Sequence, residues 1–265
     1  MGSCRIMGIL NVTPDSFYDG GKYADKNRAI ERAYRIRDEG ADLIDIGGES
    51  TRPGSKQVAA QEEIDRVCPV IEAIAGDIAI PISIDTTKSG VARAALDAGA
   101  SIVNDISGLT FDPDMTGTVA RSGAGVVIMH IQGRPETMQR NPRYDDLIAE
   151  IYQFLEEAVR KAVKAGIAQS RIIVDPGIGF GKTAGDNYRI INNIHEFKRL
   201  GLPVLVGLSR KSFTGNTGGL DSDRLPATIA LNTVSIINGA DVIRVHDVKE
   251  HRLALMSLDT LKRNS

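Results

Sequence analysis

A short pattern recurs along the chain: a Gly-Ala pair ends one segment, and a brief apolar run follows at once. It precedes the runs at 42–46, 101–105, 125–129 and 241–245. A glycine in this place is typical of a helix end. A continuous apolar run is typical of a parallel strand buried on both faces. The pattern therefore predicts helices that lead into parallel strands.

Apolar runs and helical patterns alternate over the whole chain. We expect strands at 5–10, 42–46, 81–84, 101–105, 125–129, 171–174, 203–207 and 241–245. We expect helices at 26–39, 60–75, 88–98, 113–122, 144–165, 185–200, 224–238 and 248–262. Strict alternation over 265 residues predicts an α/β fold, a single (β/α)8 TIM barrel. No Gly/Pro/Ser-rich linker interrupts it, so we expect one domain over 1–265; a doubly wound open sheet is the alternative.

Charge and cysteine content argue against several classes of protein. Lys plus Arg is 32 and Asp plus Glu is 34, a net charge of −2, so binding driven by the charge of nucleic acid or membrane is not expected. No apolar run approaches the ~18 residues of a membrane helix, and the N-terminus lacks a signal-peptide pattern. Cys4 and Cys68 form no disulfide framework. We expect a cytoplasmic protein.

Polar side chains follow every expected strand, where TIM barrels carry their active sites. They include Asn11, Asp45, Asp85, Asn104, Asp105, His130, Asp175, Ser209, Lys211, Arg244 and His246. Acceptor groups such as Asp85 suit the N–H edge of a heterocycle, whereas the cations suit phosphate or carboxylate. The mixture predicts a site for an anionic, phosphorylated heterocycle and a second anionic ligand.

Three further segments stand out. The loops 11–25 and 47–59 exceed the usual 2–6 residues of such connections, which favours a functional role. The segment 176–183, PGIGFGKT, nearly matches a phosphate-binding loop, but Pro176 stands where that motif needs its first glycine. Its glycines are better explained by close approach of the backbone to a ligand beside Asp175.

Seven segments, in order and spread over the chain, resemble the signature segments of bacterial dihydropteroate synthase. They are NVTPDSFYDGG (11–21), DIGGESTRPGS (45–55), SIDTTK (83–88), VNDISG (103–108), DPGIGFGK (175–182), GLSRKSF (207–213) and RVHDV (244–248). The resemblance implies a pterin-binding TIM barrel, usually a homodimer. It also implies condensation of 6-hydroxymethyl-7,8-dihydropterin pyrophosphate with p-aminobenzoate in folate biosynthesis, the step that sulfonamides target.

The resemblance also implies roles for the residues that hold the first substrate. The pterin and its pyrophosphate are expected to bind Thr51, Asp85, Asn104, Asp175, Lys211, Arg244 and His246. The two aspartates and the asparagine would accept from the N–H edge of the pterin, and Lys211 would donate to the opposite side of the ring. Arg244 and His246 would grip the pyrophosphate. Asn11 would ligate Mg²⁺, the implied cofactor, which neutralises charge on the leaving group.

The residues implied for the second substrate surround an aryl pocket. p-Aminobenzoate is expected to bind Phe17, Thr51, Arg52, Pro53, Phe180, Ser209 and Ser212. The two phenylalanines and the proline would form its apolar walls, and Arg52 would close it. The carboxylate would lie near Ser212, expected at the start of the helix after the seventh strand, where backbone N–H groups favour an anion.

The implied reaction is SN1-like, with Asp19, Lys211 and Asn11 as catalytic residues. Asp19 would stabilise the cation left on the exocyclic methylene when pyrophosphate departs. A neutral arylamine then attacks, so no activated Ser or Cys is needed, and the sequence contains neither G-x-S-x-G nor H-E-x-x-H.

Two alternatives remain open from the sequence alone. A corrinoid methyltransferase that uses methyltetrahydrofolate would share the pterin-binding barrel but would need neither the pyrophosphate grip nor the aryl pocket. A degenerate barrel that only binds would have little need for Asn11, Asp19, Lys211 and Arg244 together. The segment 216–219 is richer in glycine than the resemblance leads us to expect.

Overall fold

The structure is a computed structural model that describes residues 4–13, 21–215 and 224–264. An eight-stranded parallel sheet runs in the order β6-β5-β4-β3-β2-β1-β8-β7. Its strands are β1 (Arg5–Asn11), β2 (Leu43–Gly47), β3 (Ile82–Asp85), β4 (Ile102–Asp105), β5 (Gly125–Met129), β6 (Ile172–Asp175), β7 (Leu205–Val206) and β8 (Val242–Val245). A parallel bridge between Val174 and Val204 links β6 to the start of β7 and so brings the two ends of the sheet together.

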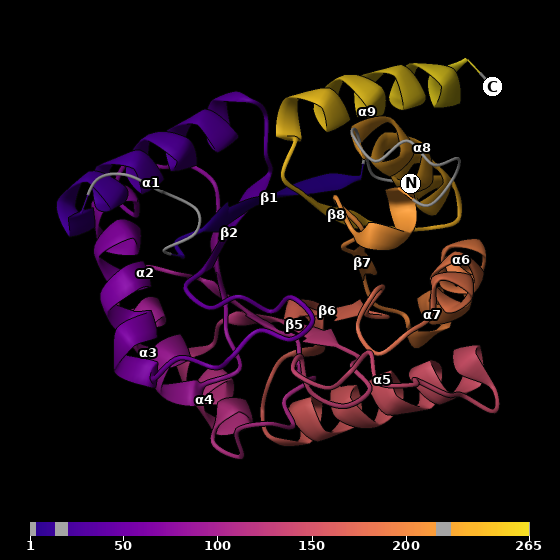
Figure 1. The fold of residues 1–265 in the computed structure, drawn as a ribbon, viewed down its shortest axis with the longest axis horizontal. Helices are drawn as coiled ribbons and strands as arrows, with labels where there is room; N and C mark the ends of the chain where they lie inside the picture. Colours follow the sequence, from indigo (N-terminus) through magenta and orange to yellow (C-terminus); the bar gives the residue numbers. More distant parts are fainter. Residues whose placement is uncertain (1–3, 14–20, 216–223, 265) are drawn as a thin grey trace.

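The helices lie outside the strands and cover them (Figure 1). They are α1 (Gly21–Asp38), α2 (Ala60–Ile74), α3 (Ser89–Asp97), α4 (Met115–Ser122), α5 (Leu147–Lys164), α6 (Ala184–Asn192), α7 (Ile194–Phe197), α8 (Leu225–Ile237) and α9 (Val248–Arg263). In α5 the buried residues Leu147, Ile151 and Leu155 recur every fourth position, which gives the helix one apolar face toward the strands. The Asp146 side chain caps its first turn by accepting from the Ala149 N–H at 3.2 Å.

The TIM barrel predicted from the sequence is confirmed, and the open doubly wound sheet is wrong. Two expected elements differ in extent. The helix expected at 185–200 is interrupted at Asn193, whose backbone leaves the helical region and whose amide donates to the Arg189 carbonyl at 2.8 Å. The strand expected at 203–207 shortens to Leu205–Val206, where only two residues pair with β8.

Among the described residues, no helix is both long and apolar enough to cross a membrane. Cys4 and Cys68 are both buried, and neither forms a disulfide within the described part of the chain.

Candidate active site

The polar side chains of the site stand directly above an apolar layer inside the barrel. That layer consists of Met7, Leu43, Ile102, Val127, Ile173, Leu205 and Val242. Side chains two residues apart on a strand point to the same face. Two residues beyond members of the layer come Asp45, Asn104, Asp175 and Arg244. The barrel interior therefore changes from apolar to polar toward the carboxyl ends of its strands.

The register of the parallel strands places four residues, one each from β1 to β4, side by side at the same height in the barrel. Asn11 is paired with Gly47, Gly47 with Asp85, and Asp85 with Asn104. A Cβ atom at Gly47 would lie 3.5 Å from the Asp85 Cβ and 3.9 Å from the Asn11 Oδ1, so both side chains border the space above this glycine.

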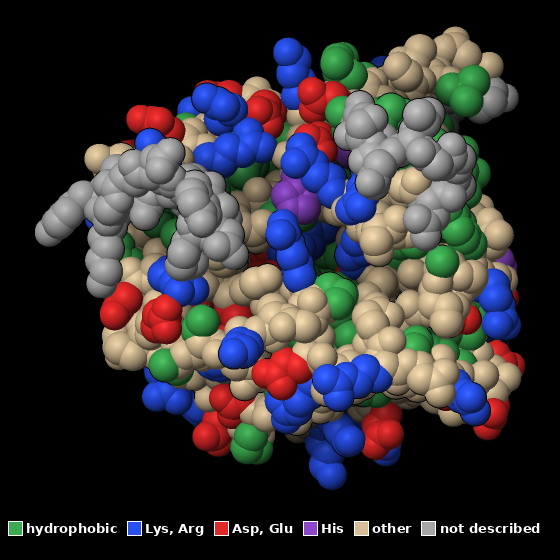
Figure 2. Space-filling model, viewed as in Figure 1, with side chains coloured by type: hydrophobic (Ala, Val, Ile, Leu, Met, Phe, Trp, Pro, Cys, Tyr) green, Lys and Arg blue, Asp and Glu red, His purple; other side chains and the backbone are tan. Residues whose placement is uncertain are grey.

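On the face of the molecule seen in Figure 2, Lys and Arg side chains and a histidine gather around a central hollow.

Arg244 holds two buried carboxylates together at the base of the site. Its Nε donates to the Asp45 Oδ2 and its second guanidinium nitrogen donates to the Asp85 Oδ2, each at 2.6 Å. The Asn104 amide also donates to the Asp45 Oδ2, at 2.9 Å. Burial raises the pKa of Asp85 to about 7, although the Arg244 charge opposes the rise.

The Asp45 and Asp85 carboxylates each keep one oxygen that accepts no hydrogen bond from the described residues. The Oδ1 atoms of Asp45 and Asp85 are buried and have no hydrogen-bond partner among the described residues. A buried acceptor left unpaired costs stability. Asp45 and Asp85 thus offer acceptors that a ligand with N–H groups could use.

Asp175 and Lys211 form the opposite side of the site. The Asp175 Oδ1 accepts from the Gly177 N–H at 2.7 Å, and burial raises the pKa of this carboxyl. The Lys211 ammonium donates to the Ile178 carbonyl and lies 4.5 Å from the centre of the Phe180 ring, a cation–π arrangement. Burial lowers the pKa of Lys211 to about 7, and attraction to Asp175 opposes that change.

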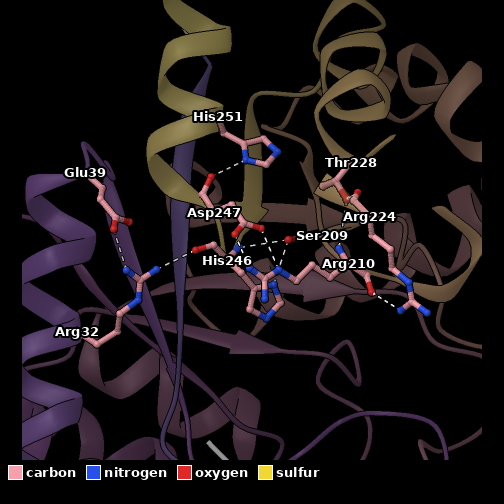
Figure 3. Close-up of polar contacts among 9 residues, drawn as sticks. All are labelled: Arg32, Glu39, Ser209, Arg210, Arg224, Thr228, His246, Asp247 and His251. Carbon is pink, nitrogen blue, oxygen red and sulfur yellow. Dashed lines mark hydrogen bonds and ion pairs between the residues drawn. The ribbon is translucent and has the colours of Figure 1, made fainter. Parts of the chain in front are cut away.

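His246 is held by contacts on both of its sides (Figure 3). Its Nδ1 lies 3.0 Å from the Ser209 hydroxyl oxygen, and its carbonyl accepts from Arg32 at 2.9 Å. Next to it, Asp247 accepts from the Arg210 Nε at 3.0 Å. Burial lowers the pKa of His246 to about 4, with Arg244 adding to the effect. The imidazole is therefore neutral at pH 7.

The loop between β2 and α2 is tied down at its base. The Glu49 Oε2 accepts from the Val58 N–H and from the Lys88 ammonium, each at 2.7 Å. Lys88 also donates to the fully buried Glu63 at 2.6 Å. Between these anchors, Thr51 is half-buried, whereas Arg52 and Pro53 are exposed.

The structure brings most of the residues expected from the sequence to the carboxyl ends of the strands, but not all can be placed. Phe17 and Asp19 lie outside the described residues. Ser212 begins a short 3-10 helix, Ser212–Gly215, rather than the α-helix expected after the seventh strand; that helix, α8, begins only at Leu225. An α-helix N-terminus at Ser212 is therefore a wrong expectation.

Two residues make contacts in the site for which the sequence predicted no specific role, although Asp45 was expected at the rim and Lys182 lies in the segment 176–183. Asp45 binds both Arg244 and Asn104. Lys182 is almost fully buried behind Asp175 and contacts His130. The only indication of these contacts in the sequence was that both residues lie at or after the end of an expected strand.

No group of three metal-ligating side chains occurs among the described residues. Asn11 supplies one partly exposed amide oxygen at the end of β1. Mg²⁺ usually keeps several waters and binds through one or two protein ligands plus substrate phosphates. A single amide oxygen fits that way of binding, whereas it would not fit a metal held by the protein alone.

Comparison with known proteins gives the family. A family model described as pterin binding enzyme matches residues 7–246. The dihydropteroate synthase of Synechocystis sp. is 49% identical over 92% of this chain and 85% of that protein. The chain belongs to the dihydropteroate synthase family of pterin binding enzymes.

Other members of the dihydropteroate synthase family agree with this placement. A probable bifunctional folylpolyglutamate synthase/dihydropteroate synthase of Haloferax volcanii is 48% identical over 94% of this chain, which spans only 30% of that longer protein. The Xanthomonas albilineans enzyme solved with 4-aminobenzoic acid has a TM-score of 0.92 and 42% identity, covering 98% of this chain and 93% of that one. The same enzyme solved with 7,8-dihydropteroate has a TM-score of 0.89 and 40% identity, covering 98% and 94%.

Proposed function

We propose that this chain condenses 6-hydroxymethyl-7,8-dihydropterin pyrophosphate with p-aminobenzoate to give 7,8-dihydropteroate and pyrophosphate. The observation that carries the proposal is a set of buried acceptors that shares one barrel mouth with Lys211, Arg244 and His246. Acceptors suit the N–H edge of a pterin, whereas the Arg244 cation and an N–H group of the neutral His246 suit a pyrophosphate. The relatives solved with 4-aminobenzoic acid and 7,8-dihydropteroate support the same pair of ligands here.

The pterin is proposed to lie between Asp85, Asn104 and Asp175. The amide nitrogen of Asn104 is already used by Asp45, which leaves its carbonyl oxygen as an acceptor. The free Oδ1 of Asp85 supplies a second acceptor while Arg244 keeps the other oxygen of that carboxylate. Lys211 would donate to an acceptor on the opposite side of the ring.

The pyrophosphate is proposed to extend toward Arg244 and His246. The contacts that fix Arg244 and His246 in the unliganded protein reduce the loss of side-chain freedom on binding. Thr51 lies on the adjoining loop and could donate its hydroxyl to a phosphate oxygen. Asn11 would hold Mg²⁺ together with the phosphate oxygens, and the ion, when bound, offsets negative charge on the leaving group.

In the reaction, the C–O bond between the exocyclic methylene and pyrophosphate breaks, and the leaving oxygen keeps the electron pair. The lone pair of the arylamine then forms the new C–N bond, and the nitrogen releases one proton to solvent. Asp19 is proposed to stabilise the intervening cation. Arg52, Pro53, Phe180, Ser209 and Ser212 would surround the aryl ring and its carboxylate, together with Phe17.

We further propose a homodimer formed through α8 and α9. These helices pack against each other and expose Val234, Ile237, Leu253, Met256 and Leu261. Apolar side chains gathered on one face are typical of an interaction surface, and a twofold axis would pair that face with itself. One domain and a cytoplasmic location complete the proposal; two buried cysteines without a disulfide among the described residues agree with a reducing compartment.

The purified chain, mixed with dihydropterin pyrophosphate, p-aminobenzoate and Mg²⁺, is expected to release pyrophosphate only when both organic substrates are present. A parallel reaction offers methyltetrahydrofolate and a corrinoid acceptor. Methyl transfer there without pyrophosphate release in the first reaction would favour the methyltransferase alternative and refute the proposal.

A further inference from the structure

The near phosphate-binding segment PGIGFGKT contains a buried lysine that the proposed reaction does not use. Lys182 is 2% exposed. Its ammonium lies 2.9 Å from the His130 Nδ1 and 3.0 Å from the Phe180 carbonyl, with the His130 carbonyl more distant at 3.5 Å. These three acceptors match the three donors of an ammonium group.

The acceptor role of His130 is settled by its surroundings. Burial lowers the pKa of this imidazole to about 2, and the Lys182 charge contributes. The ring is therefore neutral, so Nδ1 accepts from Lys182 and the proton stays on Nε2. The ring also packs edge-on against Phe154 with centroids 5.0 Å apart, which fixes its orientation.

Lys182 thus fastens the loop after β6 to the end of β5. The fit between the two backbones is close, because a Cβ atom at Gly177 would lie 1.8 Å from the His130 carbonyl oxygen. The fastened loop presents three groups to the site: the Gly177 N–H to Asp175, the Ile178 carbonyl to Lys211, and the Phe180 ring under the Lys211 ammonium.

Folding alone offers little reason for a charge at this place. No carboxylate lies within ion-pair distance of the Lys182 ammonium among the described residues, and neutral acceptors repay the loss of hydration only in part. Burial accordingly lowers the pKa of Lys182 to about 7, although the charges of Asp175 and Asp186 oppose the change. The loop also has further ties to the rest of the protein, from Tyr144 to the Gly181 carbonyl and from Gln139 to the Gly179 carbonyl, each at 2.7 Å.

We propose that Lys182, with His130 as its acceptor, is a positioning residue that sets Phe180 for the second substrate. The inference rests on the proposed function. Without the Lys182 contacts, the loop can shift at Phe180, which is the expected wall of the aryl pocket. Asp175 belongs to β6 itself, so we expect the residues that bind the pterin to move less than Phe180 does.

The test compares Lys182→Met with the wild type in steady-state kinetics. We expect the KM for p-aminobenzoate to rise about tenfold or more, since small displacements of positioning groups cost rate or affinity steeply. The dissociation constant of the pterin substrate, measured by calorimetry, should change less than about threefold. Lys164→Met, which removes an exposed lysine of α5, is the matched control and should behave as wild type.

A second pair of variants tests His130 and serves if Lys182→Met does not fold. His130→Asn restores an acceptor for Lys182, whereas His130→Phe keeps the ring but removes the acceptor. We expect the asparagine variant to retain a KM for p-aminobenzoate closer to that of the wild type than the phenylalanine variant does. Equal values for these two variants, or an unchanged KM in a folded Lys182→Met, would overturn the inference. Absence of turnover by the wild type would instead refute the proposed function.

Discussion

Replacing Arg244 by methionine tests the electrostatic arrangement at the base of the site. The substitution keeps most of the apolar stem and removes two hydrogen bonds of 2.6 Å to buried carboxylates. A hydrogen bond to a charged group contributes about 1.5–3 kcal/mol, so two contribute about 3–6 kcal/mol. Breaking a buried ion pair by removing one partner costs about 3–5 kcal/mol. We expect the free energy of unfolding at pH 7.5 to fall by about 3–5 kcal/mol.

The sign of the pH dependence follows from Asp85. The Arg244 charge holds the pKa of Asp85 down against burial, so the variant raises that pKa above its present value of about 7. An unfolded Asp carboxyl titrates near pH 3.9. That unfolded value is common to both proteins, so Asp85 contributes to the loss only above the wild-type folded pKa of about 7, and below it the carboxyl is protonated in both folded proteins. Because pH 7.5 lies only about half a unit above the wild-type pKa and one pKa unit corresponds to about 1.4 kcal/mol, the loss should be up to about 0.8 kcal/mol smaller at pH 5.5.

The assay is urea unfolding of both proteins at pH 7.5 and 5.5, with midpoint and slope reported. Arg199→Met is the control, because Arg199 forms an exposed ion pair with Glu196 and should leave the midpoint unchanged. A loss below about 1 kcal/mol at pH 7.5 would refute the reasoning, since it lies under the range for one charged hydrogen bond. A loss of equal size at both pH values would refute the role assigned to Asp85.

Three further outcomes follow from the same geometry. Asp175→Asn should weaken pterin binding by about ten- to a hundredfold in calorimetry, because an amide N–H replaces a carboxylate acceptor; unchanged affinity would contradict that role. Competitive acetylation followed by mass spectrometry should give Lys211 an apparent pKa near 7, far below that of exposed Lys164 in the same sample; similar values for the two lysines would show that burial does not lower it. Ile237→Glu, which places a charge on the apolar face of α8 and α9, should shift the protein from dimer to monomer in sedimentation, and an unchanged dimer would contradict the proposed interface.

Local patterns in the sequence were sufficient to predict the barrel. Apolar runs and helical periodicity are properties of neighbouring residues, and strands followed by helices leave few possible topologies. The ends of helices and strands were less predictable where a single side chain or a single pairing strand determines them. The Asn193 amide bonds back to the Arg189 carbonyl at a helix end, and β7 is only as long as its pairing with β8 allows.

The site could be predicted as a set of residues, but not as a set of pairs. Strand ends indicated Asp85, Asn104, Asp175 and Arg244, because parallel strands deliver their carboxyl ends to one rim. The pairing of Arg244 with Asp45, 199 residues away in sequence, has no local signature. The same is true of Lys182 and His130, which are 52 residues apart. The glycines around Lys182 indicated close backbone approach, but its acceptor could be found only in the structure.

Formation of labelled product tests the central claim most directly. The wild-type protein, supplied with dihydropterin pyrophosphate, Mg²⁺ and ring-labelled p-aminobenzoate, should produce 7,8-dihydropteroate that carries the label, with one pyrophosphate released per molecule formed. Liquid chromatography with mass spectrometry detects the product, and a pyrophosphate assay on the same sample gives the ratio. No labelled dihydropteroate from a folded protein, or pyrophosphate released without incorporation of the label, would contradict the account.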